Sequence, residues 1–311
     1  MQHVKQALKA AFKKADKPLL DRCITEQRSP GLPDIRRIQH FPARRVIRAS
    51  RAFNRLHHWQ YDTLHPCFPL FLGLSLHIDV LTANASPFPL MGLVHTENTI
   101  NQLLPLNAED MEITCHFSDV RLHPRGIAID VMLTVTQQDI VRQQITSTYL
   151  YRGASGVLKQ TPESDGAYVS GPEKTFTATS VMNFDAAAGR RYARISGDYN
   201  PIHLYRWCAR LFGFKHAIAH GTHVLARCIS TLSDATATGQ HAFSVTNAFR
   251  YPVLLPSEMR LNSNGEESIE GSEVSEVSFE LRDKQAVRRK QVVLCGRIGA
   301  PLQHIPANPR N

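Results

Sequence analysis

The chain has 311 residues, which is enough for about two domains with a hydrophobic core each. Hydrophobic residues make up 42% of the sequence and charged residues 20%, the balance of an ordinary globular protein rather than of a disordered or membrane-embedded chain. The net charge of +9 favours an acidic partner, such as the phosphates of a cofactor, an acidic protein, nucleic acid or an anionic membrane surface.

The cysteines and the first residues bear on the cellular compartment. The six cysteines are scattered without a C-x-x-C pair, and no apolar signal segment follows the first methionine. This pattern predicts reduced thiols and a cytoplasmic protein. No sequence motif of a DNA- or RNA-binding module is present, so we expect no nucleic-acid partner.

Residues 1–18 have the pattern of a short basic amphipathic helix. Lysines recur at positions 5, 9 and 13, and apolar residues recur one position earlier at 4, 8 and 12. One interpretation is a helix that docks on a membrane surface or a partner. The other, which we favour, is a terminal helix whose apolar stripe packs on the body of the protein.

Residues 24–55 are rich in arginine and proline, with Arg44, Arg48 and three further arginines close together. Such runs are usually a solvated face. They can also bind phosphate, because the guanidinium group matches the geometry of phosphate oxygens. We therefore name Arg44 and Arg48 as candidate contacts for a phosphorylated ligand.

Residues 66–81 form an apolar run without charge until Asp79, which predicts a buried helix because the run is too short to span a bilayer. Four strand-like runs follow, at 93–103, 111–120, 127–136 and 140–151. Residues 153–173 contain Gly, Ser and Pro in a turn-rich cluster that predicts a linker.

The second half repeats this plan. A strand is expected at 176–182, a short helix at 185–196, a central helix at 220–233, and four strands near 243–251, 258–262, 274–282 and 289–298. Leu-Leu-Pro ends at residues 105 and 256, and shifting the first apolar helix by the same 151 residues brings it almost onto the second. A shared offset indicates internal duplication.

The most informative stretch is Ser196–His203, which places a carboxylate, an amide and an imidazole within six residues. Pro201 keeps Asn200 out of the helical region, so the segment should be rigid. Asp198 and His203 can then face each other, as general acid/base chemistry requires. The alternative is an Asx-turn, in which Asp198 or Asn200 only bonds its own backbone.

The run from Tyr192 to Thr222 resembles the MaoC-like dehydratase and (R)-specific enoyl-CoA hydratase family. It contains S-G-D-x-N-P-I-H, then G-F, then I-x-H-G, with Thr222 where the family pattern has Met. His65-Pro66 through Gly92-Leu93-Val94-His95 looks like the first half of its two-domain members. The resemblance implies an α+β double hot dog fold, in which two antiparallel sheets each wrap round a central helix.

The resemblance also implies a function and roles for residues. The family hydrates trans-2-enoyl thioesters, or dehydrates (R)-3-hydroxyacyl thioesters, carried by coenzyme A or acyl carrier protein. It places Asp198 and His203 on the water, Asn200 beside them, and the Gly221 N–H on the thioester oxygen, with His220 and Thr222 in the same turn. No cofactor is expected.

The first half lacks these motifs, so only residues 174–311 should be catalytic. We expect residues 1–152 to bind the acyl chain, with Phe71 and Leu74 against it, in a monomer with an internal pseudo-dimer or in a homodimer.

Other interpretations remain open. His216, His220 and His223 have a spacing that could hold a metal ion, although Gly221 interrupts the run and we expect none. A hot dog thioesterase would need a carboxylate on a central helix, where Asp79 and Asp234 are the only acids. A non-catalytic acyl- or carrier-protein-binding module is the third possibility.

Overall fold

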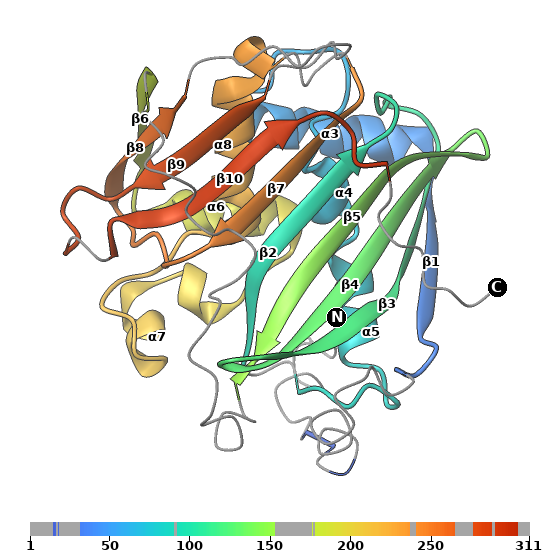
Figure 1. Cartoon of the computed structure of the whole chain (residues 1–311), viewed down its shortest axis with the longest axis horizontal. Coiled ribbons are helices and arrows are strands. Elements are labelled where there is room, and N and C mark those ends of the chain that lie inside the picture. Colours follow the sequence, from blue (N-terminus) through green and yellow to red (C-terminus); the bar gives the residue numbers. More distant parts are fainter. Residues whose placement is uncertain are drawn as a thin grey trace.

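The computed structural model describes residues 15–16, 18, 32–89, 92–152, 176, 178–236, 241–264, 276–287 and 290–303. Most of the predicted helix 1–18 and all of the predicted linker 153–173 lie outside these residues. The described chain forms one ten-stranded antiparallel sheet, and most of its helices lie against one face (Figure 1). The strand order is β1-β3-β4-β5-β2-β7-β10-β9-β8-β6.

Both halves of the chain follow the same order of elements. The first half has β1 (Arg36–Phe41), α3 (Ala43–His57), α4 (Phe68–Leu72), α5 (Leu74–Leu81), β2 (Leu93–Gln102), β3 (Met111–His123), β4 (Gly126–Gln137) and β5 (Ile140–Tyr151). The second half has β6 (Ala178–Phe184), α6 (Ala188–Ser196), the 3₁₀ turn η2 (Pro201–His203), α7 (Arg206–Leu211), α8 (Gly221–Thr236), β7 (Phe243–Phe249), β8 (Ser257–Ser263), β9 (Val277–Arg282) and β10 (Val292–Gly299).

The two halves share one sheet because their first post-helix strands pair with each other. β2 and β7 run antiparallel, with Asn98 opposite Asn247 and Ile100 opposite Val245. Each half therefore contributes five neighbouring strands, and the two halves meet where β2 pairs with β7. Alternate residues point to the helix face, where Ile100 and Val245 are fully buried in the common core.

The sequence analysis missed β1 and α3, which occupy the arginine-rich segment. Four arginines, at 44, 48, 51 and 55, follow a helical spacing and are exposed on α3. The opposite stripe of this helix is narrow and buried, and it includes Val46 and Phe53. The arginines do form a solvated face, but it belongs to an ordered amphipathic helix.

The apolar run of the first half is a broken helix. Gly73 separates α4 from α5, and its N–H donates to the carbonyl of Pro69 at 2.8 Å. A Cβ at Gly73 would lie 3.0 Å from that carbonyl oxygen, so a larger residue would strain this junction. Every residue of α4 is buried, which confirms the prediction of a buried helical segment.

Two further predictions can be compared with the described residues. The cysteines at 67, 115, 208, 228 and 295 are free and buried, in line with reduced thiols. Among the helices described, none is both long and apolar enough to cross a membrane.

Two buried histidines link α3 of the first half to the central helix α8 of the second half. The His57 Nδ1–H donates to the carbonyl of Phe53 at 2.8 Å, which leaves its Nε2 to accept from His223 Nδ1 at 2.9 Å. Burial lowers the pKa of His57 to about 3 and holds the pKa of His223 well below 6.5. Burial keeps both imidazoles neutral, and the link between α3 and α8 requires that His57 Nε2 keep its lone pair.

We expect acid to destabilise the fold through these histidines. The unfolded pKa is 6.5, so the contribution of neutral His57 is complete above pH 6.5 and is lost as the pH falls toward about 3. Each such histidine should change the unfolding free energy by ~1.4 kcal/mol per pH unit within this window. Urea unfolding between pH 7.5 and 4.5 measures the slope.

The control for this prediction is a histidine on the surface. His57→Gln should lower stability at pH 7.5 and make the pH dependence shallower by about one proton. His40→Gln, at an exposed position of β1, should keep the wild-type slope. An unchanged slope in His57→Gln would show that this site does not contribute to acid sensitivity.

Candidate active site

The segment after α6 is a tight, locally bonded loop. Gly197 adopts the left-handed conformation (φ 76°) that ends α6, and its N–H donates to the carbonyl of Ala193. Asp198 Oδ1 accepts the N–H of Asn200 at 3.2 Å, and Asn200 Oδ1 accepts the N–H of Ile202 at 3.4 Å. The Asx-turn interpretation is therefore correct for the local geometry, and Asn200 caps η2.

The same loop directs Asp198 and His203 toward a third residue, His220. The rings of His203 and His220 stack with 3.8 Å between centroids. His220 Nε2 donates to the backbone carbonyl of Asp198 at 3.1 Å and lies 3.7 Å from its carboxylate Oδ2. The ligand atoms of Asp198, His203 and His220 all lie within 4.8 Å of one another.

Hydrogen bonding fixes the tautomer of His203. Its Nδ1 lies 2.9 Å from the carbonyl of Ile218, which can only accept, so Nδ1 carries the proton. Nε2 is then left with a lone pair. Burial lowers the pKa of His203 despite the opposing charge of Asp198, so the ring is neutral at pH 7 and can act as a base.

His220 differs from His203 in having its Nε2–H occupied. Burial, followed by the neighbouring His203, lowers the pKa of His220 to about 3. Its Nδ1 is buried without a hydrogen-bond partner among the described atoms. His220 therefore serves as a neutral platform under His203 and as a tie to the backbone of Asp198.

Gly221 begins α8, the sixteen-residue central helix of the second half. The N–H groups of its first turn have no intrahelical partner and lie at the positive end of the helix dipole. A Cβ at Gly221 would lie 3.1 Å from the ring of Phe249, which is tighter than an ordinary van der Waals contact, so this ring occupies the space beside the glycine Cα. The glycine lets α8 pack on β7.

Thr222, which stands where the family pattern has Met, lies beside a tyrosine that the sequence analysis did not single out, Tyr192 of α6. The ring of Tyr192 is buried 4.7 Å from His220 and 5.4 Å from His223. Burial and the charge of Asp198 raise the pKa of Tyr192, so it stays protonated. In the sequence, the only sign that Tyr192 lies near the site is its position in a helix six residues before Asp198.

The first half supplies aromatic and imidazole groups on the far side of Phe249. The ring of Phe249 lies 5.2 Å from His95, and His95 stacks on Tyr149 at 4.8 Å. The Tyr149 hydroxyl hydrogen-bonds to His77 Nδ1 at 2.9 Å. Burial chiefly raises the pKa of Tyr149, and the charge of Asp198 adds to it. The pairing of β2 with β5 places His95 opposite Tyr149, and the pairing of β2 with β7 brings Phe249 beside them. Of these residues, the sequence analysis quoted only His95, and it gave that residue no role.

The predicted substrate contacts lie at different distances from this cluster. The ring of Phe71 in α4 is buried 6.4 Å from that of Tyr192, and Leu74 begins α5 half-buried. Arg44 and Arg48 are exposed near the start of α3. Arg44 lies about 20 Å along the helix from His57, at 1.5 Å per residue.

The alternative metal ligands do not gather. His223 turns its Nδ1 to His57. Among the residues that the structure describes, the group with metal-like spacing is Asp198, His203 and His220, not the three histidines considered from the sequence.

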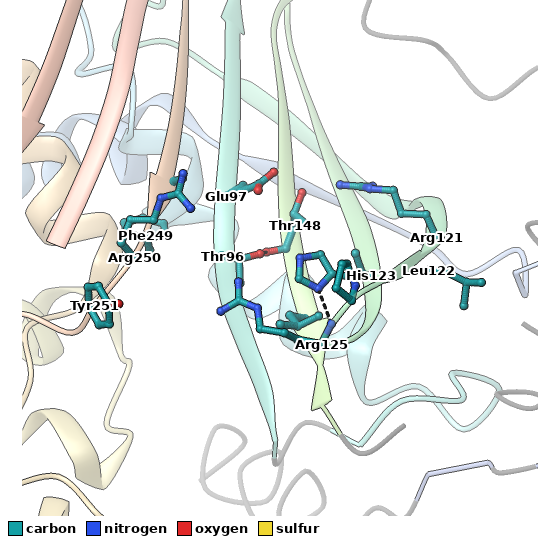
Figure 2. A pocket seen from close by; sticks show the side chains of 14 residues that line it. Thr96, Glu97, Arg121, Leu122, His123, Arg125, Thr148, Phe249, Arg250 and Tyr251 are labelled. Atoms are coloured by element: carbon teal, nitrogen blue, oxygen red, sulfur yellow. Dashed lines mark hydrogen bonds between the residues drawn. The ribbon is translucent and has the colours of Figure 1, made fainter. Parts of the chain in front are cut away.

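A cavity of about 330 Å³ lies beside Phe249, at the ends of β2 to β5 and β7 (Figure 2). Arg121, Arg125 and Arg250 line it together with Glu97. Arg121 also forms an ion pair with Asp130. The arginines closest to Phe249 thus come from the strand ends rather than from α3.

Comparison with known proteins places part of the chain in a known family. Residues 168–286 match the family described as MaoC like domain. The 3-hydroxyacyl-thioester dehydratase X of Mycobacterium tuberculosis is 32% identical over 195 residues, which cover 61% of this chain and 66% of that protein, just under two thirds of its length. Residues 168–286 therefore contain a MaoC-like domain, and the chain is similar to a 3-hydroxyacyl-thioester dehydratase.

Solved structures give the fold. The crystal structure of HtdX from M. tuberculosis has a TM-score of 0.64 at 23% identity, covering 86% of this chain and all of that one. A MaoC-like dehydratase from Phytophthora capsici gives 0.67 at 16%, covering 94% and 99%. A conserved hypothetical M. tuberculosis protein with a double hotdog fold gives 0.50 at 10%, covering 88% and 96%. The predicted α+β double hot dog is confirmed.

Gly189 is the residue of α6 whose size should matter most for the loop. A Cβ there would lie 2.0 Å from the carbonyl oxygen of His203, so Gly189→Ala must displace η2. We expect a loss of about 1–3 kcal/mol in unfolding free energy and a loss of activity. Gly299→Ala is the control, because its Cβ would find its nearest atom at 3.9 Å. Equal stability of the two variants would contradict this packing.

Proposed function

We propose that this protein hydrates trans-2-enoyl thioesters and dehydrates (R)-3-hydroxyacyl thioesters reversibly, in cytoplasmic fatty-acyl metabolism. The observation that carries the proposal is the convergence of Asp198 and His203, together with the free Nε2 of a neutral His203. One water can bond both groups, because two hydrogen bonds of about 2.8 Å span up to ~5.6 Å.

The proton transfers follow from this arrangement. In the hydration direction, Asp198 positions the water by a hydrogen bond and His203 Nε2 accepts a proton from it. The water oxygen bonds to the β-carbon of the enoyl group at the same time. The double bond's electrons move to the thioester oxygen as an enolate. A proton then returns to the α-carbon, so one water is added in total. Dehydration is the reverse.

The enolate oxygen needs hydrogen-bond donors in the transition state. The first turn of α8 offers unpaired N–H groups at a positive helix end, and we assign the oxygen to the Gly221 N–H. Tyr192 of α6 packs against His220, the residue before this turn, and lies beside Thr222. Asn200 acts through the loop, because its side-chain oxygen caps η2.

The donor and the acyl chain would approach from the first half. The ring of Phe71 near Tyr192 supports an acyl path along α4 and α5. The arginine-lined cavity beyond Phe249 supports a phosphorylated donor, either coenzyme A or the phosphopantetheine arm of a carrier protein. The 3-hydroxyacyl-thioester dehydratase relative is in line with this class of substrate.

No observation favours the thioesterase alternative. Asp234 lies thirteen residues beyond Gly221 on α8, about 20 Å along the helix, and accepts a hydrogen bond from Tyr61. Asp79 lies near the end of α5. Neither carboxylate reaches the site around His203.

The decisive test is removal of the dyad. Asp198→Asn or His203→Ala should lower kcat for hydration of crotonyl-CoA by about 10²- to 10⁴-fold with little change in thioester binding, since the interaction is realised in the transition state. The double variant should be little worse than the poorer single one.

Asp198→Asn also separates the alternatives. Asn keeps the Asx-turn acceptor, so a purely structural Asp198 would leave activity near wild type. Near wild-type hydration by a variant with an unchanged melting temperature would reject the proposal. A wild-type protein that binds acyl-CoA but shows no turnover would be a binding module.

The acyl path predicts a change in chain-length preference. Leu74→Phe should shift kcat/KM toward shorter enoyl chains, because a larger side chain shortens the path, and Phe71→Leu should shift it toward longer ones. Ile140→Phe, at an exposed position of β5, is the control. Unchanged preference in both variants would place the chain elsewhere.

A further inference from the structure

The neighbourhood of α7 exposes an unusual number of large apolar side chains. Trp207 and Leu211 are 68% and 79% exposed. Together with three aromatic residues that flank the helix, they form what we call the α7 surface: Tyr199, Tyr205, Trp207, Leu211 and Phe212. Clusters of this kind mark interaction sites rather than ordinary protein surface.

The solvent-exposed face of α7 carries large apolar side chains, which is unusual for a helix that contacts only water. Cys208 and Ala209 are buried, so the helix is anchored on that side. Trp207 and Leu211 are four residues apart and form one exposed row, and Arg206 and Arg210 form the next. An apolar row beside a cationic row is the pattern of a helix lying at a membrane interface.

The charged residues on α7 and in the segment that follows it are all basic, and Asp198, just before Tyr199, is the nearest acid in the sequence. Arg206, Arg210 and Lys215 are exposed, and the sequence contains no Asp or Glu from Tyr199 through Ser233. The complementary occupant is therefore anionic. Arginine and lysine reach lipid phosphates while Trp and Tyr settle at the headgroup level.

We propose that the α7 surface seats the protein on an anionic lipid bilayer. The helix lies at the edge of the molecule, away from the sheet (Figure 1), and its exposed row points outward. Because α7 is adjacent to η2, this seating places the 198–203 loop next to the lipid. The proposal concerns surface association and does not depend on the proposed catalytic function.

The two tryptophans of the chain allow a local test. Trp59 is buried and Trp207 is exposed, so Trp59→Phe leaves Trp207 as the single reporter. Addition of phosphatidylglycerol vesicles should shift its emission to the blue, and brominated lipids should quench it. Phosphatidylcholine vesicles should have little effect, and 0.5 M salt should weaken binding, because the attraction is screened.

Variants then tie the binding to this surface. In vesicle sedimentation, Arg206→Glu with Arg210→Glu should lower the partition coefficient at least tenfold, and Leu211→Asp should lower it several-fold. Val181→Asp and Arg55→Glu are exposed controls that should bind as wild type. Melting temperatures check that each variant is folded.

Three outcomes would overturn the proposal. The first is an unshifted Trp207 spectrum with phosphatidylglycerol. The second is unchanged sedimentation of the α7 variants, which would place any membrane contact elsewhere on the chain. The third is self-association in the ultracentrifuge that Leu211→Asp abolishes, without vesicle binding, which would assign the surface to a second copy.

Discussion

The peptide of Ile218 fixes both the position and the protonation of His203. Its carbonyl accepts the His203 Nδ1–H, and its N–H donates to the carbonyl of Ile202 in the same loop. The flanking residues are bonded in turn to the segment after β7, through Ala219 to Val253 and Leu255 to Ala217. The segment 217–219, between α7 and α8, thus connects the 198–203 loop to the chain that follows β7. Because Nδ1 of His203 carries the proton, Nε2 is its basic nitrogen.

Several histidines in the interior are buried and uncharged. His57, His220 and His223 are all held neutral by desolvation, and each finds at least one hydrogen-bond partner in that state. A protonated imidazole at any of these positions would lose solvation without gaining a nearby counter-ion, except beside Asp198. The region behind His203 is therefore a low-dielectric wall, which strengthens hydrogen bonds in the site.

The two halves of the duplicated fold contribute different groups around Phe249. The second half holds the D-x-N-P-x-H loop and the helix terminus at Gly221, whereas the first half contributes α4, α5 and the wall formed by His77, His95 and Tyr149. The β2–β7 pairing brings both sets against Phe249. In the proposed mechanism, the groups that transfer protons come from the second half alone.

Local patterns in the sequence determined much of this protein. Proline and glycine around Asp198 predicted the rigid loop, hydrophobic periodicity predicted most strands and both central helical segments, and the shared offset predicted the repeat. These features depend on residues near one another in the chain. The spacing of the arginines in residues 44–55 also indicates a helix. The sequence analysis missed this helix because few of its residues are apolar and the arginines dominate the segment.

Tertiary structure alone decided the rest. The stacking of His203 on His220, the ring contact of Tyr192 with His220, and the link from His223 to His57 join residues between 17 and 166 positions apart. The resemblance implied two antiparallel sheets, and only the structure shows that β2 and β7 pair and join them edge to edge into one. Such contacts depend on the packing of whole elements, and no local pattern of residue types encodes which of several buried histidines will meet.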